Sequence, residues 1–361
     1  MKSISLFAGA GGDSLGLKNA GFEVIGFVEF WDKAVKTHKL NFPESRFIGE
    51  CVKGDITKIT DDELRKYENK IDILFAGFPC QGFSHAGKKD PSDLRNKLFW
   101  EFIRATEIIK PKWIIGENVA GLVHRKTDDG KAYIKDVIVN EFQNIGYKMA
   151  EPTVLKAEQY GIPQKRRRVF FVGSREGIDF KFPEPTTPNN FPGLSNILTN
   201  SLDNAEEIDN SIVHEFNSNA TLNITNKELS GKPHPYLLRK IKSNQISYRR
   251  RISPHHIEMI DPTAPAKTIH CGYSFQPRLF VGLTQNKKTF LREFTLNELA
   301  QIQGFPKDYK FFGNRDDIIK QIGNAVPPKL VEELARKIIN SDSSIQKPAR
   351  ETSSLILETG A

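Results

Sequence analysis

A cysteine stands in a proline-containing turn directly after a predicted buried strand. Cys80 belongs to the run Gly77-Phe78-Pro79-Cys80-Gln81, which follows the apolar residues 71–76. A turn at the carboxyl end of a strand places this thiol at the sheet edge where α/β proteins bind their ligands. A lone cysteine is more often an inert, buried side chain. If Cys80 is held as a thiolate, however, it can act as a nucleophile.

Ionisable side chains follow two later strands and are expected at the same edge. Glu117 comes after the predicted strand 113–115, and Arg166 and Arg168 stand at the start of the predicted strand 168–172. Alternation along a strand sends Arg166 and Arg168 to one face, so that the pair can point into the site, and Arg167 to the other. Glu117 alone would fit a solvated loop or a helix cap. Beside a thiolate it suits a proton donor.

A glycine-rich turn lies between the first predicted strand and the first predicted helix. The run Phe7-Ala8-Gly9-Ala10-Gly11-Gly12 lets the backbone turn tightly and approach a ligand. Glu29, twenty residues after Gly9, is placed to accept hydrogen bonds from ribose hydroxyls. Asp55 either approaches the same ligand or is an ordinary loop residue. The pattern indicates a nucleoside-containing cofactor without specifying which one, and a tight turn without a ligand is the alternative.

Strands and helices alternate through the first half of the chain. Strands are predicted over residues 2–7, 23–28, 71–76, 113–115 and 168–172, and helices over 32–40, 93–109 and 134–145, with one more ending at Gly21. In the helix 93–109, Leu98, Phe102, Ala105 and Ile109 mark the buried face. This alternation predicts a doubly wound, mostly parallel α/β sheet that is covered by helices on both faces.

The periodicity ends after Gly173 and returns only in part. A proline- and asparagine-rich stretch follows, then β-like runs at 266–269 and 279–283 and helices at 296–303, 316–322 and 328–339. We therefore expect a first domain over 1–174, a smaller, irregular, β-containing domain over 175–320, a C-terminal helix over 321–341 that returns to the first domain, and a flexible tail over 342–361.

Composition favours a folded protein with an acidic partner. The chain has 361 residues, 38% of them hydrophobic, and a formal net charge of +8. No apolar run approaches the roughly 18 residues that span a bilayer, and no signal-peptide pattern is present, so we expect a cytosolic protein without membrane contact. The three cysteines are far apart and have no paired spacing, which predicts neither disulfides nor a metal site.

Basic charge is concentrated in one segment. Residues 231–251 contain seven basic residues and no acidic one: Lys232, Arg239, Lys240, Lys242, Arg249, Arg250 and Arg251. A solvated face is the ordinary explanation of such a charge run. Contact with nucleic-acid phosphates is the alternative.

In order along the chain, these motifs resemble those of the C5-cytosine DNA methyltransferase family of bacterial restriction-modification type. The runs 7–12, 77–81, 117–119 and 164–168 match its cofactor, catalytic, carboxylate and arginine motifs, and 292–306 and 321–327 resemble its last two. The resemblance covers 3–174 and 262–340 and leaves the middle as the family's variable target-recognition region. Phe30 stands where the family often places a side chain against adenine, whereas Asn297 occupies a position that is usually basic.

The resemblance implies methyl transfer from S-adenosylmethionine to carbon 5 of a cytosine flipped out of double-stranded DNA. Because carbon 5 is a weak nucleophile, Cys80 would first add to carbon 6, with Glu117 bonded to ring nitrogen 3, and Arg166 and Arg168 holding the base or a phosphate. The implied cofactor contacts are Phe7, Ala8, Gly9, Gly11, Gly12, Glu29, Phe30, Asp55, Ile56, Gly77, Pro79, Leu98, Asn324 and Ala325. The implied DNA contacts are Gln81, Ser84, Arg249, Arg250, Arg251 and Thr268.

The resemblance further implies a cytoplasmic monomer, with or without a restriction endonuclease that acts on the same sequence without stable contact. The nearest alternative, a transfer-RNA cytosine methyltransferase, carries a Cys-Phe-Thr signature that is absent here, since Gly272 follows Cys271 and Val52 follows Cys51. A nicotinamide dehydrogenase would share the glycine turn but would not account for Cys80. A non-catalytic DNA-binding module would need neither Cys80 nor Glu117.

Overall fold

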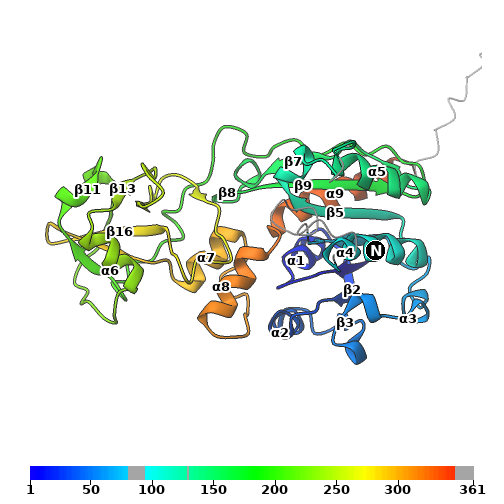
Figure 1. Ribbon diagram of the computed structural model, residues 1–361, viewed down its shortest axis with the longest axis horizontal. Helices are drawn as coiled ribbons and strands as arrows, with labels where there is room; N and C mark the ends of the chain where they lie inside the picture. Colours follow the sequence, from blue (N-terminus) through cyan, green and yellow to red (C-terminus); the bar gives the residue numbers. More distant parts are fainter. Residues whose placement is uncertain (80–93, 128–129, 346–361) are drawn as a thin grey trace, which may run out of the picture.

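The computed structural model describes residues 1–79, 94–127 and 130–345. Two β-sheets lie toward opposite ends of the molecule, and the helices α7 (Leu296–Gln303) and α8 (Arg315–Asn324) lie between them (Figure 1). Within the described ranges, no helix combines the length and the apolar character that crossing a lipid bilayer requires.

The larger sheet is built from the first half of the chain. Its eight strands follow the order β3-β2-β1-β4-β5-β9-β6, with β7 also paired to β9. Their bounds are β1 (Lys2–Leu6), β2 (Glu23–Val28), β3 (Arg46–Phe47), β4 (Ile73–Ala76), β5 (Trp113–Val119), β6 (Lys148–Met149), β7 (Thr153–Lys156) and β9 (Arg167–Ser174). Because β1 to β5 pair in parallel, the prediction of a mainly parallel α/β sheet is confirmed.

The strand predicted at 168–172 departs from the parallel arrangement. β9 runs antiparallel to β5, β6 and β7. The chain reaches β9 from β7 through residues 157–166 without a crossover helix, and parallel neighbours need such a crossover. β5 is also longer than predicted, so Glu117 lies within this strand and not after it.

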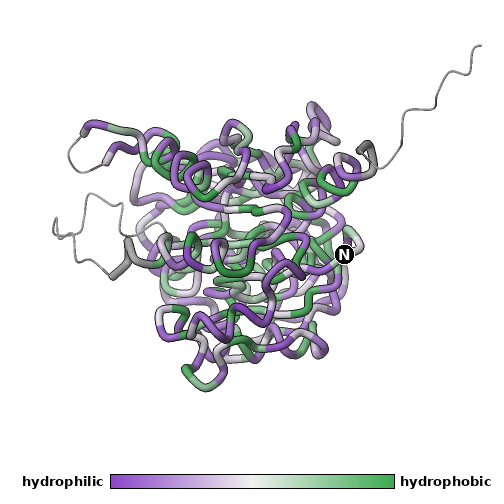
Figure 2. Tube along the Cα trace, turned by 90° about the vertical axis from the view of Figure 1, so that its right-hand side faces the viewer, coloured by the Kyte–Doolittle hydropathy of each residue, from purple (hydrophilic) through white to green (hydrophobic). Residues whose placement is uncertain are grey.

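Side-chain alternation in β4 divides the core of this sheet into two layers. Leu74 and Ala76 face a cluster that includes side chains of α4 (Leu94–Ile109) and α5 (Ile134–Asn144). Ile73 and Phe75 face the opposite cluster, with α1 (Gly12–Asn19) and α9 (Pro328–Ile345). Helices therefore cover both faces. In Figure 2 the outer helices alternate between green and purple, as expected for helices with one apolar side.

Two shorter helices and the end of α9 complete the part of the molecule around the first sheet. α2 (Asp32–Asn41) and α3 (Asp61–Arg65) connect the strands on the β3 side of the sheet. α9, at the other end of the chain, packs against α1 and continues to Ile345, beyond its predicted end at 339. The end of the chain thus returns to the sheet formed by its beginning.

The second sheet has seven strands in the order β10-β17-β16-β14-β13-β11, with β12 paired to β16. Their bounds are β10 (Glu206–Ile208), β11 (Val213–His214), β12 (Leu222–Asn223), β13 (Ile246–Tyr248), β14 (Ile257–Met259), β16 (Leu279–Gln285) and β17 (Lys288–Arg292). α6 (Pro235–Lys242) packs on this sheet. β10 to β14 are missing from the sequence prediction because strands of two or three residues show no periodicity. The helix α6 is also missing from it, although α6 is amphipathic.

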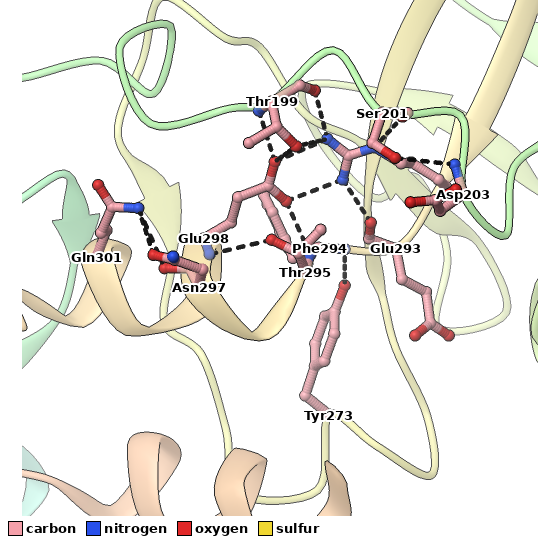
Figure 3. Close-up of polar contacts among 11 residues, drawn as sticks. Thr199, Ser201, Asp203, Tyr273, Glu293, Phe294, Thr295, Asn297, Glu298 and Gln301 are labelled. Carbon is pink, nitrogen blue, oxygen red and sulfur yellow. Dashed lines mark hydrogen bonds and ion pairs between the residues drawn. The ribbon is translucent and has the colours of Figure 1, made fainter. Parts of the chain in front are cut away.

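A buried ion pair connects the second sheet to α7. Arg292, at the end of β17, donates to Glu298 Oε1 at 2.7 Å and to Oε2 at 2.9 Å. The same carboxylate accepts the backbone N–H groups of Thr199 and Thr295, and Figure 3 shows these groups converging on it. Burial alone would raise the pKa of Glu298, but Arg292 and these hydrogen bonds hold it below its usual value. The carboxylate therefore stays charged and fixes the helix to the strand.

Candidate active site

A buried acid and an arginine meet at the carboxyl end of β5. Arg168 Nε lies 2.7 Å from Glu117 Oε1, because the antiparallel register with β9 places Arg168 opposite Val119. Glu117 is only 7% exposed. Burial raises the pKa of Glu117, and the positive charges of Arg168 and Arg166 offset only part of that rise. The carboxyl group is therefore biased toward its protonated form, as a proton donor requires.

The chain that leaves β4 passes beside this carboxyl group. A Cβ placed on Gly77 would lie 3.6 Å from Glu117 Oε2. Asn118 Nδ2 donates to the carbonyl oxygen of Phe78 at 2.9 Å and holds the segment against β5. Pro79, partly buried, is the last described residue here. Three predicted site residues follow it and lie outside the described residues: Cys80, Gln81 and Ser84.

Arg166 forms no ion pair with Glu117 among the described residues, although its positive charge acts on that carboxyl group. Its guanidinium is buried and donates to three backbone carbonyls, those of Ile269 at 3.3 Å, Gly323 at 2.9 Å and Ala325 at 3.0 Å. Arg166 lies in the link between β8 (Gln164–Lys165) and β9, where strand alternation does not apply. It therefore connects the first sheet to two later segments of the chain.

The glycine turn is closely packed on one side and open on the other. A Cβ on Gly12 would lie 2.2 Å from the carbonyl oxygen of Val326, and one on Gly11 would lie 2.7 Å from the Phe42 ring. Among the described residues, and apart from the adjacent residues of the chain, none has an atom within 4 Å of the corresponding position on Gly9. The positive φ angles of Gly9 and Gly11, 54° and 84°, also favour glycine. Glycine thus allows the turn to pack inward while Gly9 faces open space.

Glu29 organises this turn. Its Oε2 accepts the Gly9 N–H at 2.8 Å, and its Oε1 accepts the Trp31 N–H at 2.7 Å. Burial raises the pKa of Glu29, although the same backbone hydrogen bonds oppose the rise. Each carboxylate oxygen retains a further lone pair for a ligand hydroxyl. The neighbouring Phe30 is 71% exposed and presents an unburied ring beside the turn.

The other predicted cofactor residues occupy different environments. A Cβ on Gly54 would lie 1.9 Å from the Glu29 carbonyl oxygen, which places Asp55 next to the Glu29 segment. Asp55 caps a short 3₁₀ helix by accepting the N–H of Thr57. Ile56 is buried in the core, so its side chain is not available to a ligand, whereas Leu98 is only partly buried there. The last two predicted cofactor residues lie at the end of α8, where Asn324 is exposed and Ala325 is buried.

A layer of buried polar side chains beneath the glycine turn is absent from the sequence prediction. Ser5 donates to Asp13, and Ser14 is hydrogen-bonded to His38 at 2.9 Å. Burial raises the pKa of Asp13 to about 7 and lowers that of His38 to about 3. Asp13 directly follows the Gly11-Gly12 pair, but the sequence does not show that α1 turns its side chain inward. The layer therefore becomes visible only in three dimensions.

The described DNA-contact candidates follow β13 of the second sheet or lie in the segment 266–269 that joins the second sheet to β8. Thr268 donates to the carbonyl oxygen of Lys165 at 2.7 Å, next to the parallel pairing of β8 with β15 (Ala266–Lys267). Arg249 forms an ion pair with Asp261 at 2.8 Å, and Arg250 lies 3.9 Å from Glu215. Arg251 is exposed and lines a surface cleft. The three arginines thus differ in how far protein carboxylates already neutralise them.

Comparison with known proteins identifies the family. The model of the C-5 cytosine-specific DNA methylase family matches residues 1–340. The chain belongs to this family. Type II methyltransferase M1.HphI of Haemophilus parahaemolyticus is 32% identical, over 94% of this chain and 87% of its own length. Type II methyltransferase M.NgoFVII of Neisseria gonorrhoeae is 33% identical, over 94% and 86%.

Solved structures support the fold of the methylase. A DNMT2 variant of Spodoptera frugiperda superposes with a TM-score of 0.65 at 19% identity, covering 94% of this chain and 99% of its own. The Dnmt2 methyltransferase of S. pombe gives 0.65 at 16% identity, over 94% and 98%. At these identities the likeness concerns the fold, a Rossmann-like methyltransferase fold. The family match confirms a DNA methyltransferase that modifies carbon 5 of cytosine and excludes a nicotinamide dehydrogenase.

The glycine turn of this methylase fits the methyl donor of the family, S-adenosylmethionine. A ribose needs hydrogen-bond acceptors, and Glu29 offers a partly buried carboxylate held in place by two backbone amides. An adenine ring needs an apolar surface, and the Phe30 ring is exposed next to that carboxylate. The open space at Gly9 leaves room for both groups.

Proposed function

We propose that this methyltransferase acts through a covalent bond between Cys80 and carbon 6 of a cytosine flipped out of duplex DNA. The observation that carries the proposal is the Glu117–Arg168 pair at the end of β5, beside the segment that leads from Gly77 into Cys80. Addition of the thiolate to carbon 6 turns carbon 5 into an enamine carbon that is nucleophilic enough to accept a methyl group. S-adenosylmethionine, when bound, supplies that methyl group.

Glu117 and Arg168 stabilise this addition. The buried, protonated carboxyl group of Glu117 donates to ring nitrogen 3 as negative charge develops on the ring. Arg168 keeps the carboxyl group in position and provides positive charge, which favours the thiolate form of Cys80. Arg166 acts from further away, by holding the chain segments around the site. After methylation, loss of the carbon 5 proton lets the sulfur leave.

The cofactor and the DNA occupy two sides of this site in the proposal. The turn from Phe7 to Gly12, with Glu29, Phe30 and Asp55, binds the cofactor, helped by the backbone of Ile56, by Gly77, Pro79 and Leu98, and by Asn324 and Ala325. Gln81, Ser84, Thr268 and the three arginines 249–251 contact the DNA. The first sheet with α9 then forms the catalytic domain, and the second sheet forms the target-recognition domain, within the predicted bounds 175–320.

The biological setting is part of the proposal. Relatives over 30% identical along almost the whole chain are named type II methyltransferases. We assign this protein the modification role in a restriction-modification system, as a cytoplasmic monomer. A partner endonuclease would act on the same DNA sequence and would not bind the methyltransferase stably.

Trapping with 5-fluorocytosine tests the covalent cycle. Fluorine on carbon 5 cannot leave as a proton does, so the enzyme should stall after methyl transfer while still bonded to the DNA. A complex that survives denaturing electrophoresis is expected, and only when S-adenosylmethionine is present.

Cys80→Ser is the matched control. It should form no trapped complex but should bind S-adenosylmethionine normally, because the glycine turn and Glu29 are unchanged. Normal turnover of fluorinated DNA by the wild-type enzyme, or trapping of the serine variant, would disprove the Cys80 adduct.

A further inference from the structure

A cleft of about 620 Å³ lies on the second sheet, on the side that faces the link between the two sheets. Its lining includes Arg251, Thr268, His270, Gln276 and Arg278. Desolvation lowers the pKa of His270, and the positive charges of Arg166, Arg168 and Arg278 lower it further. Arg166 donates to the carbonyl oxygen of Ile269, the residue before His270, and Thr268 in the cleft wall donates to that of Lys165. The cleft therefore adjoins the segment that carries the active-site arginines.

The wall of this cleft is held rigidly. The turn 270–276 is closed by backbone hydrogen bonds from Tyr273 to His270 and from Gln276 to Gly272. The buried Tyr273 hydroxyl donates to the carbonyl oxygen of Leu279 at 2.9 Å, which anchors the turn to the start of β16. A Cβ on Gly323 would lie only 2.4 Å from the nitrogen of Cys271, so α8 also packs tightly against the turn.

Arg278 extends into the cleft from this rigid base. Its carbonyl oxygen accepts the N–H of Glu258 at 2.8 Å, next to the pairing of β14 with β16. Its guanidinium donates to Gln276 Oε1 at 3.3 Å. In the part of the chain that the structure describes, no carboxylate forms an ion pair with Arg278, whereas Lys267 in the same wall is paired with Glu258. An exposed guanidinium, with Gln276 as its hydrogen-bond acceptor and without an ion pair among the described residues, is thus available to a ligand.

We propose that Arg278 reads a guanine in the recognised DNA sequence, with Gln276 holding its guanidinium in position. The planar guanidinium matches the O6 and N7 acceptors that guanine presents in the major groove, which is the commonest specific contact between an arginine and a base. Phosphate contacts, in contrast, position the protein without reading the sequence, and we assign that role to Arg251. The inference rests on the proposed DNA interface. It adds the residue that reads the DNA sequence, Arg278, and the base that this residue recognises, guanine.

The test begins with the recognised sequence, obtained by bisulfite sequencing of DNA methylated by the wild-type enzyme. Each guanine of that sequence is then replaced in turn by 7-deazaguanine, which lacks the N7 acceptor. At one position we expect wild-type binding to weaken about tenfold or more. Arg278→Ala should bind unmodified DNA with a similar loss and should be insensitive to the replacement at that position. Its methylation pattern should also relax there.

Two further variants complete the experiment. Arg278→Lys keeps the charge without the planar pair of donors, and should recover non-specific binding but not discrimination. Arg65→Ala removes an exposed arginine on α3, beside the first sheet. It should change neither non-specific DNA binding nor discrimination between sequences. Trapping on 5-fluorocytosine, run in parallel, shows whether the proposed chemistry itself holds.

Three results would overturn the assignment. One is that Arg278→Ala remains as sensitive as wild type to every 7-deazaguanine. Another is an equal loss of affinity for all sequences with a lower salt slope, which would make Arg278 a phosphate contact. The third is a complete loss of DNA binding by a variant with a normal thermal unfolding curve, since losing a base contact leaves non-specific binding intact.

Discussion

Burial controls the protonation of two carboxyl groups beside the glycine turn. Burial raises the pKa of Asp13 to about 7, although hydrogen bonds from Ser5 and from the backbone lower it, and the Glu117 carboxylate adds to the rise when it is ionised. Glu117 responds to burial in the same direction, against the attraction of two arginines. One group serves the proposed chemistry, while the other affects stability, so they can be tested separately.

Glu117→Gln should lower the turnover number about 10²- to 10⁴-fold and leave DNA binding largely intact, because glutamine keeps the shape but cannot transfer a proton. In the wild-type enzyme the protonated acid is the active form. Activity should therefore be present below the raised pKa and decline as pH rises through it. Methyl transfer measured against pH checks both points, and a variant that keeps more than a tenth of the turnover would remove Glu117 from the chemistry.

Asp13→Asn should stabilise the protein more at pH 8 than at pH 5. The folded-state pKa of about 7 exceeds the unfolded value of 3.8, so the folded protein binds the extra proton and loses stability as pH rises toward 7. Two pKa units between pH 5 and 7 correspond to about 3 kcal/mol. Urea unfolding at the two pH values measures the difference. An equal effect of the substitution at both values would contradict the raised pKa.

The sequence places a site residue where a motif names it, but it does not show contacts that depend only on packing. Glu117 is predicted after the strand 113–115 and Arg168 at the start of the strand 168–172, and the structure pairs the two side chains. The partners of Arg166 could not be predicted, because the residues between β8 and β9 do not form a regular strand. These partners are carbonyl groups about 100 residues or more further along the chain. The Ser5–Asp13 contact depends on how α1 faces β1, which no local pattern records.

At the level of elements, the Arg292–Glu298 pair is the strongest local determinant of how α7 meets the second sheet. The side chains are 1% and 0% exposed, and Arg292 also donates to the carbonyl oxygens of Thr199 and Ser201. Removing one partner would leave the other charge buried without compensation. The position of α7, and through it the loop before β10, depends on both residues.

Arg292→Ala should lower the free energy of unfolding by about 3–5 kcal/mol. The stranded carboxylate of Glu298 accounts for most of this loss, so Arg292→Ala combined with Glu298→Gln should recover part of it. Asn297→Ala is the control on the same helix. Asn297 accepts a hydrogen bond only from Gln301 on the surface, and a change within about 0.5 kcal/mol is expected. Chemical denaturation of all three variants checks the prediction, which fails if Arg292→Ala is as mild as Asn297→Ala.

Most elements with a clear period are predicted to within a few residues, whereas the amphipathic helix α6 and most of the shortest strands are missed. The helix α7 has the predicted bounds, and β2 also matches its prediction. The small strands β10, β12 and β14 pair with β16 or β17, and β13 and β11 pair in turn with β14 and β13. This pairing, and not their own sequence pattern, stabilises them. The direction of β9 is likewise decided by its connection to β7. Tertiary pairing therefore supplied what local periodicity lacked.

Across the whole molecule, the two sheets meet along a narrow link that also borders the proposed site. Across it, Arg166 donates to the carbonyl oxygen of Gly323, and Thr268 donates to that of Lys165. Because Gly323 has no side chain, α8 packs directly against the turn at Cys271. The active-site pair lies on one side of this link and the cleft with Arg278 lies on the other. DNA bound across the link would contact both, and the net charge of +8 would favour its approach.

Replacing Arg249, Arg250 and Arg251 together with alanine should flatten the salt dependence of DNA binding. Each lost phosphate contact lowers the slope of log affinity against log salt by about 0.9, so three contacts would lower it by about 2.7. Arg249 and Arg250 already have carboxylate neighbours in Asp261 and Glu215, whereas Arg251 forms no ion pair within the described part of the chain.

The single variant Arg251→Ala separates these contributions. If Arg251 alone contacts a phosphate, it should account for the whole change in slope, about 0.9. If DNA displaces Asp261 and Glu215 from their arginines, the triple variant should lower the slope further than the single one. Binding titrations at four or five salt concentrations measure both slopes. A triple variant with an unchanged slope would mean that these arginines form a solvated face, and that DNA reaches the cleft without them.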